Sequence, residues 1–115
     1  MRRIFFTQEM KDAIVAGKKT MTTRDHQKEL GDWEACTGNW HKPSNIKRFA
    51  TINIVSNDST TWGRQLERFK GEGFESVDAM LDFAHRTGLE RYSHAPNLYC
   101  HIFTTALDAA ASEGS

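Results

Sequence analysis

The chain has 115 residues, which suits one domain with a single small core. Its 15 basic and 15 acidic side chains give a formal net charge of zero, which argues against a protein that coats nucleic acid through charge alone. No apolar run reaches the ~18 residues of a membrane span, and no signal-peptide core follows Met1. We therefore expect a cytoplasmic protein with no membrane partner.

The N-terminal part predicts two strands around one helix. Residues 3–6 form a short apolar run typical of a strand. A helix then extends from a cap at Thr7 to Gly17, with apolar residues at helical spacing between them. The β-branched run at residues 19–24 predicts a second strand.

The middle of the chain predicts two further strands separated by loops. The polar residues 25–30 form a loop, and the Gly-Asp pair at 31–32 is expected to turn into a strand at 33–37. A loop at 38–45 follows, and the alternation of apolar and polar residues at 49–55 predicts a strand with one face in the core.

The C-terminal part predicts a turn, two helices and a closing strand. Residues 57–59 read as a turn, and a short helix is expected from Thr61, although its threonines would also suit a strand. A second helix runs from a cap at Ser76 to Gly88. Its expected apolar stripe is Val77, Met80, Leu81 and Ala84. A strand at 98–105 should place Leu98, Cys100 and Ile102 on one face.

These elements define one α+β domain over residues 1–106, followed by a small polar tail at 107–115 that is predicted to be disordered. Short strands with two or three helices favour a small curved sheet or a partly closed barrel. Two distant cysteines, Cys36 and Cys100, read as buried thiols. None of the five histidines forms a ligand-spaced pair, so we expect neither a metal nor a cofactor.

One segment carries more functional information than the rest. It has the pattern Gly17-x-Lys19-x-x-Thr22-x-Arg24, followed by Gly31-Asp32. This pattern resembles the signature of the ASCH domain family, most closely that of the small bacterial N(4)-acetylcytidine amidohydrolases. The resemblance extends from about residue 4 to about residue 103. It implies a PUA-like small β-barrel with two or three helices flanking its openings, and a cleft lined by the Lys19 segment.

The resemblance also implies roles for three residues. Thr22 would be the nucleophile, Lys19 the base that takes its proton, and Glu72 the acid that protonates the leaving group. Glu72 matches by its place in a Gly-Glu-Gly-Phe segment shortly before the helix capped by Ser76. The implied substrate is a small nucleoside, an acylated cytidine, and no cofactor is involved.

Elementary chemistry sets two conditions on this assignment. On an ideal strand Lys19 and Thr22 would lie roughly 10 Å apart, so Lys19 must sit in the turn before the strand and bend back over it. A free lysine is neutral in only about one molecule in 2,500 at pH 7, so a lysine base needs a strongly lowered pKa. Burial and the charge of Arg24 lower that pKa, whereas a carboxylate at Glu72 raises it.

Three further residues are assigned to substrate binding. The guanidinium of Arg24 suits a carbonyl or a phosphate better than it suits proton transfer. Phe6 and Phe74 are the chosen stacking partners for a base, because they flank the first helix and Glu72. For each aromatic the alternative is ordinary core packing.

Two other functions remain open at this stage. An RNA-binding module of the PUA-like kind would need only a basic, aromatic surface, and the first 71 residues hold 13 basic against 8 acidic side chains. A ribonuclease, an activity attributed to some ASCH proteins, would use the same lysine and arginine on a phosphate. In the plainest alternative, Lys18 and Lys19 end a helix and the threonines lie on an edge strand. The sequence does not indicate the oligomeric state.

Overall fold

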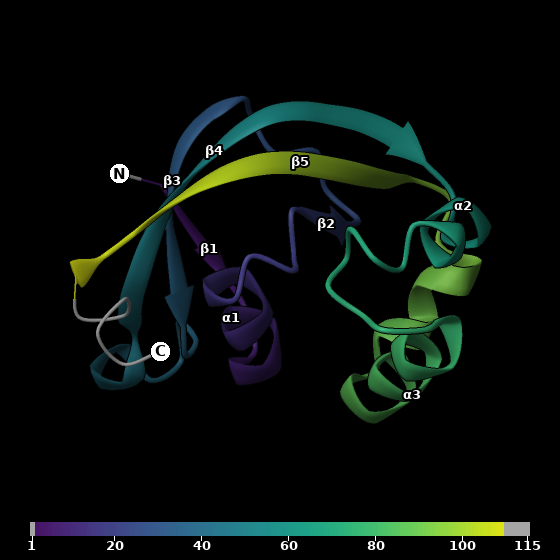
Figure 1. Ribbon diagram of the computed structural model, residues 1–115, viewed down its shortest axis with the longest axis horizontal. Helices are drawn as coiled ribbons and strands as arrows, with labels where there is room; N and C mark the ends of the chain where they lie inside the picture. The colour runs from purple at the N-terminus through teal and green to yellow at the C-terminus, as the bar shows by residue number, and fades with distance from the viewer. Residues whose placement is uncertain (1, 110–115) are drawn as a thin grey trace.

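The computed structural model describes residues 2–109, which form five strands, three α-helices and two 3-10 helices (Figure 1). In chain order the elements are β1 (Arg3–Phe5), α1 (Gln8–Val15), β2 (Met21–Arg24), β3 (Gly31–Thr37), η1 (Pro43–Asn45), β4 (Lys47–Thr60), α2 (Trp62–Glu67), α3 (Val77–Thr87), η2 (Leu89–His94) and β5 (Leu98–Leu107). Most of the tail predicted to be disordered, from residue 110 onward, lies outside the described residues.

The strands form one curled sheet in the order β1-β3-β4-β5-β2. β1 pairs in parallel with β3, and the other neighbours are antiparallel. The long strands β4 and β5 arch over α1, and their far ends reach α2 and α3 (Figure 1). Register shifts at Ala35/Cys36 and Ile54/Ser56 mark bulges, which help a sheet to bend. The result is the expected α+β half-barrel.

The core lies between α1 and the concave face of the sheet. Its buried members are Ile4, Phe6, Ile14, Ala35, Phe49, Ala50, Ile52, Ile54 and Phe103. The cysteines Cys36 and Cys100 are buried and free, as the composition suggested. Within residues 2–109 no helix is both long and apolar enough to cross a bilayer.

The three helices begin where their caps predict. The side chains of Thr7, Thr61 and Ser76 each accept a backbone N–H three residues later, so α1, α2 and α3 start immediately after them. Gly88 follows α3 with φ of 79°, a left-handed conformation that glycine adopts without strain. The ambiguity over the segment after Thr61 is therefore resolved in favour of a helix.

The predicted turns at residues 57–59 and 31–32 are both wrong. β4 continues to Thr60, because Asn57, Asp58 and Ser59 pair across the sheet with β5. Gly31 and Asp32 likewise open β3 by pairing with β4. In both places cross-strand hydrogen bonds outweigh the local turn preference of polar residues.

Two predicted apolar faces also need correction. In α3 the buried residues are Met80, Phe83 and Ala84, whereas Leu81 is 42% exposed and Val77 is 37% exposed. In β5 Ile102 is 36% exposed, and its neighbour His101 is completely buried. These three buried residues of α3 line a pocket together with residues of β2, so the orientation of the helix depends on tertiary packing and not on the apolar stripe alone.

Candidate functional site

Backbone contacts bring Lys19 to Glu72 across 53 positions of the chain. After α1 the N–H groups of Lys18 and Lys19 both donate to the carbonyl of Ala13, so the chain turns sharply before β2. Lys19 then forms a single antiparallel bridge with Glu72. The N–H of Thr20 donates to Gly71 O at 2.8 Å, which fastens the two segments together.

Lys19 and Glu72 form a buried pair. Lys19 Nζ lies 3.6 Å from Glu72 Oε1 and donates to the backbone carbonyl of Glu72 at 3.1 Å. The side chains are only 1% and 6% exposed. Burial is the main cause that lowers the pKa of Lys19; the carboxylate of Glu72 opposes it and the charge of Arg24 adds to it. The pKa of Lys19 therefore lies below its ordinary value, as a base requires.

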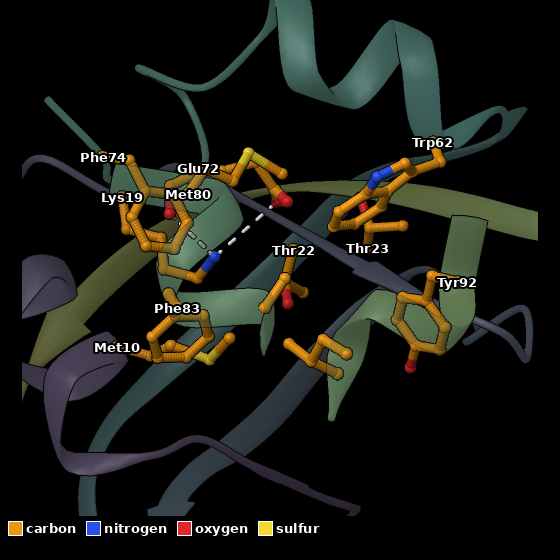
Figure 2. Close-up of a pocket in the computed structure, with 12 residues that line it drawn as sticks. Met10, Lys19, Thr22, Thr23, Trp62, Glu72, Phe74, Met80, Phe83 and Tyr92 are labelled. Carbon is orange, nitrogen blue, oxygen red and sulfur yellow. Dashed lines mark hydrogen bonds and ion pairs between the residues drawn. The ribbon is translucent and has the colours of Figure 1, made fainter. Parts of the chain in front are cut away.

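Thr22 lies on β2, and its hydroxyl donates no hydrogen bond to any of the described residues. The residue is 1% exposed, and its Oγ1 accepts a hydrogen bond from Arg24 Nε at 3.2 Å. Because Arg24 is the donor in this contact, the O–H of Thr22 stays available to donate elsewhere. Figure 2 shows the amine of Lys19 and the side chain of Thr22 directed into the same space.

His101 supports Thr22 from the neighbouring strand. Its Nδ1 lies 3.2 Å from the carbonyl of Thr22, and its Nε2 accepts the backbone N–H of Lys28 at 2.9 Å. These two partners require a neutral ring with its proton on Nδ1. Burial is the main cause that lowers the pKa of His101, and the nearby charges of Arg24 and Lys28 lower it further.

One narrow pocket is lined by the side chains of Lys19, Thr22 and Glu72 (Figure 2). Its other walls are Met10, Thr23, Trp62, Phe74, Met80, Phe83, Ala84, Leu89 and Tyr92. The cavity volume is about 20 Å³, room for about one water molecule. A second cavity of about 220 Å³ adjoins it and shares Met10, Thr23, Leu89 and Tyr92 as walls. A ligand larger than water would thus lie mainly in the second cavity and extend a small group into the first.

The residues assigned to substrate binding lie in different places. Arg24 lines the larger cavity and is fixed by donating to the carbonyl of Phe5 at 2.8 Å. Phe74 lines the narrow pocket, with its ring 5.2 Å from that of Phe83. Phe6 lines neither of these two cavities, because its ring is packed in the core under the guanidinium of Arg24.

Sequence reasoning missed several walls of the site. Tyr92 and Leu89 come from η2, whose residues show no periodic pattern. Met80 was predicted only as part of the apolar stripe of its helix, and Phe83 was not predicted at all. His101 lies within the strand predicted at residues 98–105, and no local pattern marks it as part of the site. The pairing of Thr22 with His101 between β2 and β5 would have revealed it, but strand partners are not encoded locally.

Two buried polar atoms at the site have no hydrogen-bond partner among residues 2–109, Glu72 Oε1 and Thr23 Oγ1. Glu72 Oε1 keeps its ion pair with Lys19 Nζ at 3.6 Å, but neither atom has the hydrogen bond that a buried oxygen needs, so a ligand's donor would be favourable at each. Over the same residues no group of three histidine, cysteine or acidic side chains is arranged to hold a metal ion.

The curled half-barrel is a fold that solved structures share. The chain matches the S128A mutant of ZmASCH from Zymomonas mobilis with a TM-score of 0.58 and 15% identity, over 88% of this chain and 65% of that one. It matches protein EF3133 from Enterococcus faecalis V583, a DUF984 protein, with a TM-score of 0.58 and 13% identity, over 95% of this chain and 83% of that one. No protein-family model and no curated protein sequence matches the chain. The chain shares an ASCH-like fold with these two solved structures, an α+β half-barrel.

Proposed function

We propose that the protein is an amidohydrolase that removes the acyl group from N(4)-acetylcytidine or a related acylated nucleoside. The observation that carries the proposal is the buried amine of Lys19, which has a lowered pKa and shares one narrow pocket with Thr22 and Glu72. A binding module would gain nothing from a lysine that is costly to bury. A base that must be neutral gains its reactivity from that same burial.

In the first half of the reaction Thr22 attacks the amide. Transfer of a proton within the Lys19–Glu72 pair leaves a neutral amine and a carboxylic acid. The amine takes the proton of the Thr22 hydroxyl while Oγ1 bonds to the carbonyl carbon of the substrate. The C–N bond then breaks, and Glu72 gives its proton to the leaving nitrogen of the cytosine. The products of this half are the free nucleoside and an acyl ester on Thr22.

In the second half a water molecule hydrolyses that ester. The proton that Lys19 accepted passes to Glu72, so the amine is neutral again and takes a proton from the attacking water. The resulting hydroxide attacks the acyl carbon, the ester bond breaks, and Thr22 recovers its proton from Lys19. The narrow pocket has room for about one water molecule, so the acyl group on Thr22 must extend into the larger cavity to leave that room for the attacking water.

Arg24 contributes by holding the nucleophile. Its Nε–H donates to Thr22 Oγ1, so it stabilises negative charge that develops on that oxygen during proton transfer. It also orients the hydroxyl, because the oxygen accepts from one side and must donate on another. We therefore assign Arg24 both to orientation and to contact with the substrate.

The test is hydrolysis of N(4)-acetylcytidine, followed by chromatography of cytidine and acetate. We expect Lys19→Met, Thr22→Val and Glu72→Gln each to lower kcat/KM by about a hundredfold or more while the fold is retained. Matched controls are Lys18→Met, Thr20→Val and Glu75→Gln, whose side chains are exposed and nearby in sequence. These controls should keep wild-type rates.

Two outcomes would overturn the proposal. Full activity in Lys19→Met would remove the mechanism. A lack of turnover, together with salt-sensitive RNA binding that survives Lys19→Met and Thr22→Val, would identify an RNA-binding module. An acyl adduct on Thr22, trapped at low pH and located by mass spectrometry, would support the covalent mechanism independently of turnover.

A further inference from the structure

The larger of the two adjoining cavities is lined by positive side chains, which an uncharged ligand would not need. Its walls are Phe5, Thr7, Met10, Thr23, Arg24, Thr87, Leu89, Arg91 and Tyr92. Two of these residues are arginines and none is acidic. The chain as a whole has no net charge, so this local excess does not follow from its composition.

Neither arginine of the cavity is neutralised by a carboxylate within residues 2–109. Arg2, Arg3, Arg48 and Arg86 each form an ion pair with an acidic side chain. Arg24 instead donates to Thr22 Oγ1 and to the carbonyl of Phe5, and Arg91 donates to the carbonyl of Gly88. The two acids that act on the charge of Arg24 are Glu72, which is paired with Lys19, and Asp25; neither lines the cavity.

Both guanidinium groups are held in place before any ligand arrives. Arg24 lies over the ring of Phe6 at 5.1 Å, and Arg91 lies over the ring of Tyr92 at 5.0 Å. A hydrogen bond and a stacked ring reduce the freedom that each side chain would lose on binding an anion. Burial is the main cause that lowers the pKa of Arg24, so an anion beside it would favour its charged form.

The two cavities meet at Thr23, whose buried Oγ1 has no partner in the described part of the chain. If an acyl group lies against Thr22 in the narrow pocket, the rest of the substrate must pass Thr23 and Tyr92 into the larger cavity. An uncharged nucleoside would leave the two arginines there without a counter-charge. The anionic group that a nucleoside can carry is a phosphate on its ribose.

We propose that the cavity lined by Arg24 and Arg91 binds this phosphate, so that the preferred substrate is an acylated nucleoside monophosphate. This inference rests on the proposed amidohydrolase function and narrows its substrate class. Arg24 and Arg91 bind the phosphate oxygens through charge-assisted hydrogen bonds, and the hydroxyl of Thr23 donates to the substrate where the two cavities join.

The kinetic test compares N(4)-acetylcytidine with its 5′- and 3′-monophosphates. We expect one of the monophosphates to have a kcat/KM at least about tenfold higher than the nucleoside, as one charge-assisted hydrogen bond would supply. Arg91→Gln should reduce that ratio towards one. Arg64→Gln, which removes another exposed arginine that lines neither cavity, should leave the ratio unchanged.

A binding test separates this inference from the proposed reaction. Cytidine, the two cytidine monophosphates and inorganic phosphate are titrated into the protein and followed by NMR of the backbone amides. We expect the phosphate-bearing probes to shift the signals of Arg24, Arg91 and Tyr92, and cytidine to shift them much less. This result would support the anion site even if no acylated compound were hydrolysed, in which case only the proposed reaction would fall.

The same experiments can overturn the inference while leaving the reaction intact. Equal kcat/KM values for nucleoside and monophosphates, or an unchanged ratio in Arg91→Gln, would exclude a phosphate site in this cavity. A short acetylated oligonucleotide serves as the last comparison. If it is a better substrate than both monophosphates, the arginines bind a phosphodiester of RNA and the mononucleotide assignment is wrong.

Discussion

Replacing Glu72 with glutamine keeps the shape of the side chain and removes its charge. The ammonium of Lys19, 1% exposed, then has no carboxylate beside it. At the observed 3.6 Å separation, two unit charges attract with about 5 kcal/mol at an effective dielectric constant of about 20. Loss of one partner from a buried pair typically costs about 3–5 kcal/mol. We expect the free energy of unfolding at neutral pH to fall by an amount in that range.

The loss should depend on pH with a definite sign. The pKa of Lys19 is already lowered by burial, and removing Glu72 removes the main cause that raises it. The folded variant therefore binds fewer protons than the unfolded chain below the ordinary lysine pKa of about 10.4. Its stability should rise as the pH is increased towards that value, and more steeply than the stability of the wild type.

Urea unfolding of a double-mutant cycle measures this coupling. The cycle compares Glu72→Gln, Lys19→Met and the double variant, in which no buried charge remains. An exposed pair, Arg86 with Glu9, serves as the control because its coupling should be at most about 1 kcal/mol. If Glu72→Gln costs less than about 1 kcal/mol, and the two cycles give equal coupling, Lys19 is solvated in solution and its base role loses its physical basis.

Two other substitutions test how the site is held. His101→Phe leaves the N–H of Lys28 and the carbonyl of Thr22 without their ring partner, so stability should fall by about 1–3 kcal/mol per group, and kcat should fall with it. Because burial lowers the pKa of His101, its stabilising effect is full above about pH 6.5 and is lost as the pH falls below that value. The free energy of unfolding of His101→Phe, measured in urea, should therefore depend less on pH in this acid range than that of the wild type. Equal pH dependence in the two proteins would contradict this. Gly73→Ala places a Cβ 2.9 Å from the Cβ of Lys19 at a backbone φ of 98°, so both stability and amide hydrolysis should decrease; wild-type activity would show that Lys19 tolerates displacement.

Local sequence signals predicted most of the elements but not how they meet. The three helix starts were predictable from their caps, Thr7, Thr61 and Ser76, because a capping side chain binds a backbone N–H within three residues of itself. The length of β4 escaped prediction because Asn57 and Asp58 have turn-like composition, yet β5 lies beside them and completes their hydrogen bonds. Turn and strand propensities depend on the residue itself, whereas strand pairing depends on which segment lies beside it in the fold.

The same distinction applies to the site. Lys19 and Thr22 stand close together in sequence, so a short pattern was enough to select them. Their proximity to Glu72, and the closure of the pocket by Tyr92 and Trp62, depend on segments more than 35 residues further along the chain. His101 was overlooked because nothing in its own surroundings in sequence shows that its ring bridges two backbones.

The bridge between Lys19 and Glu72 has a consequence for when the protein becomes reactive. The lysine is synthesised 53 residues before its partner, and until that partner docks its amine is hydrated and fully protonated like any other lysine. In the proposed mechanism the basic character of this amine then arises only when the tertiary structure is complete. Under the proposed mechanism a nascent or partly unfolded chain is inert, and activity begins only with folding.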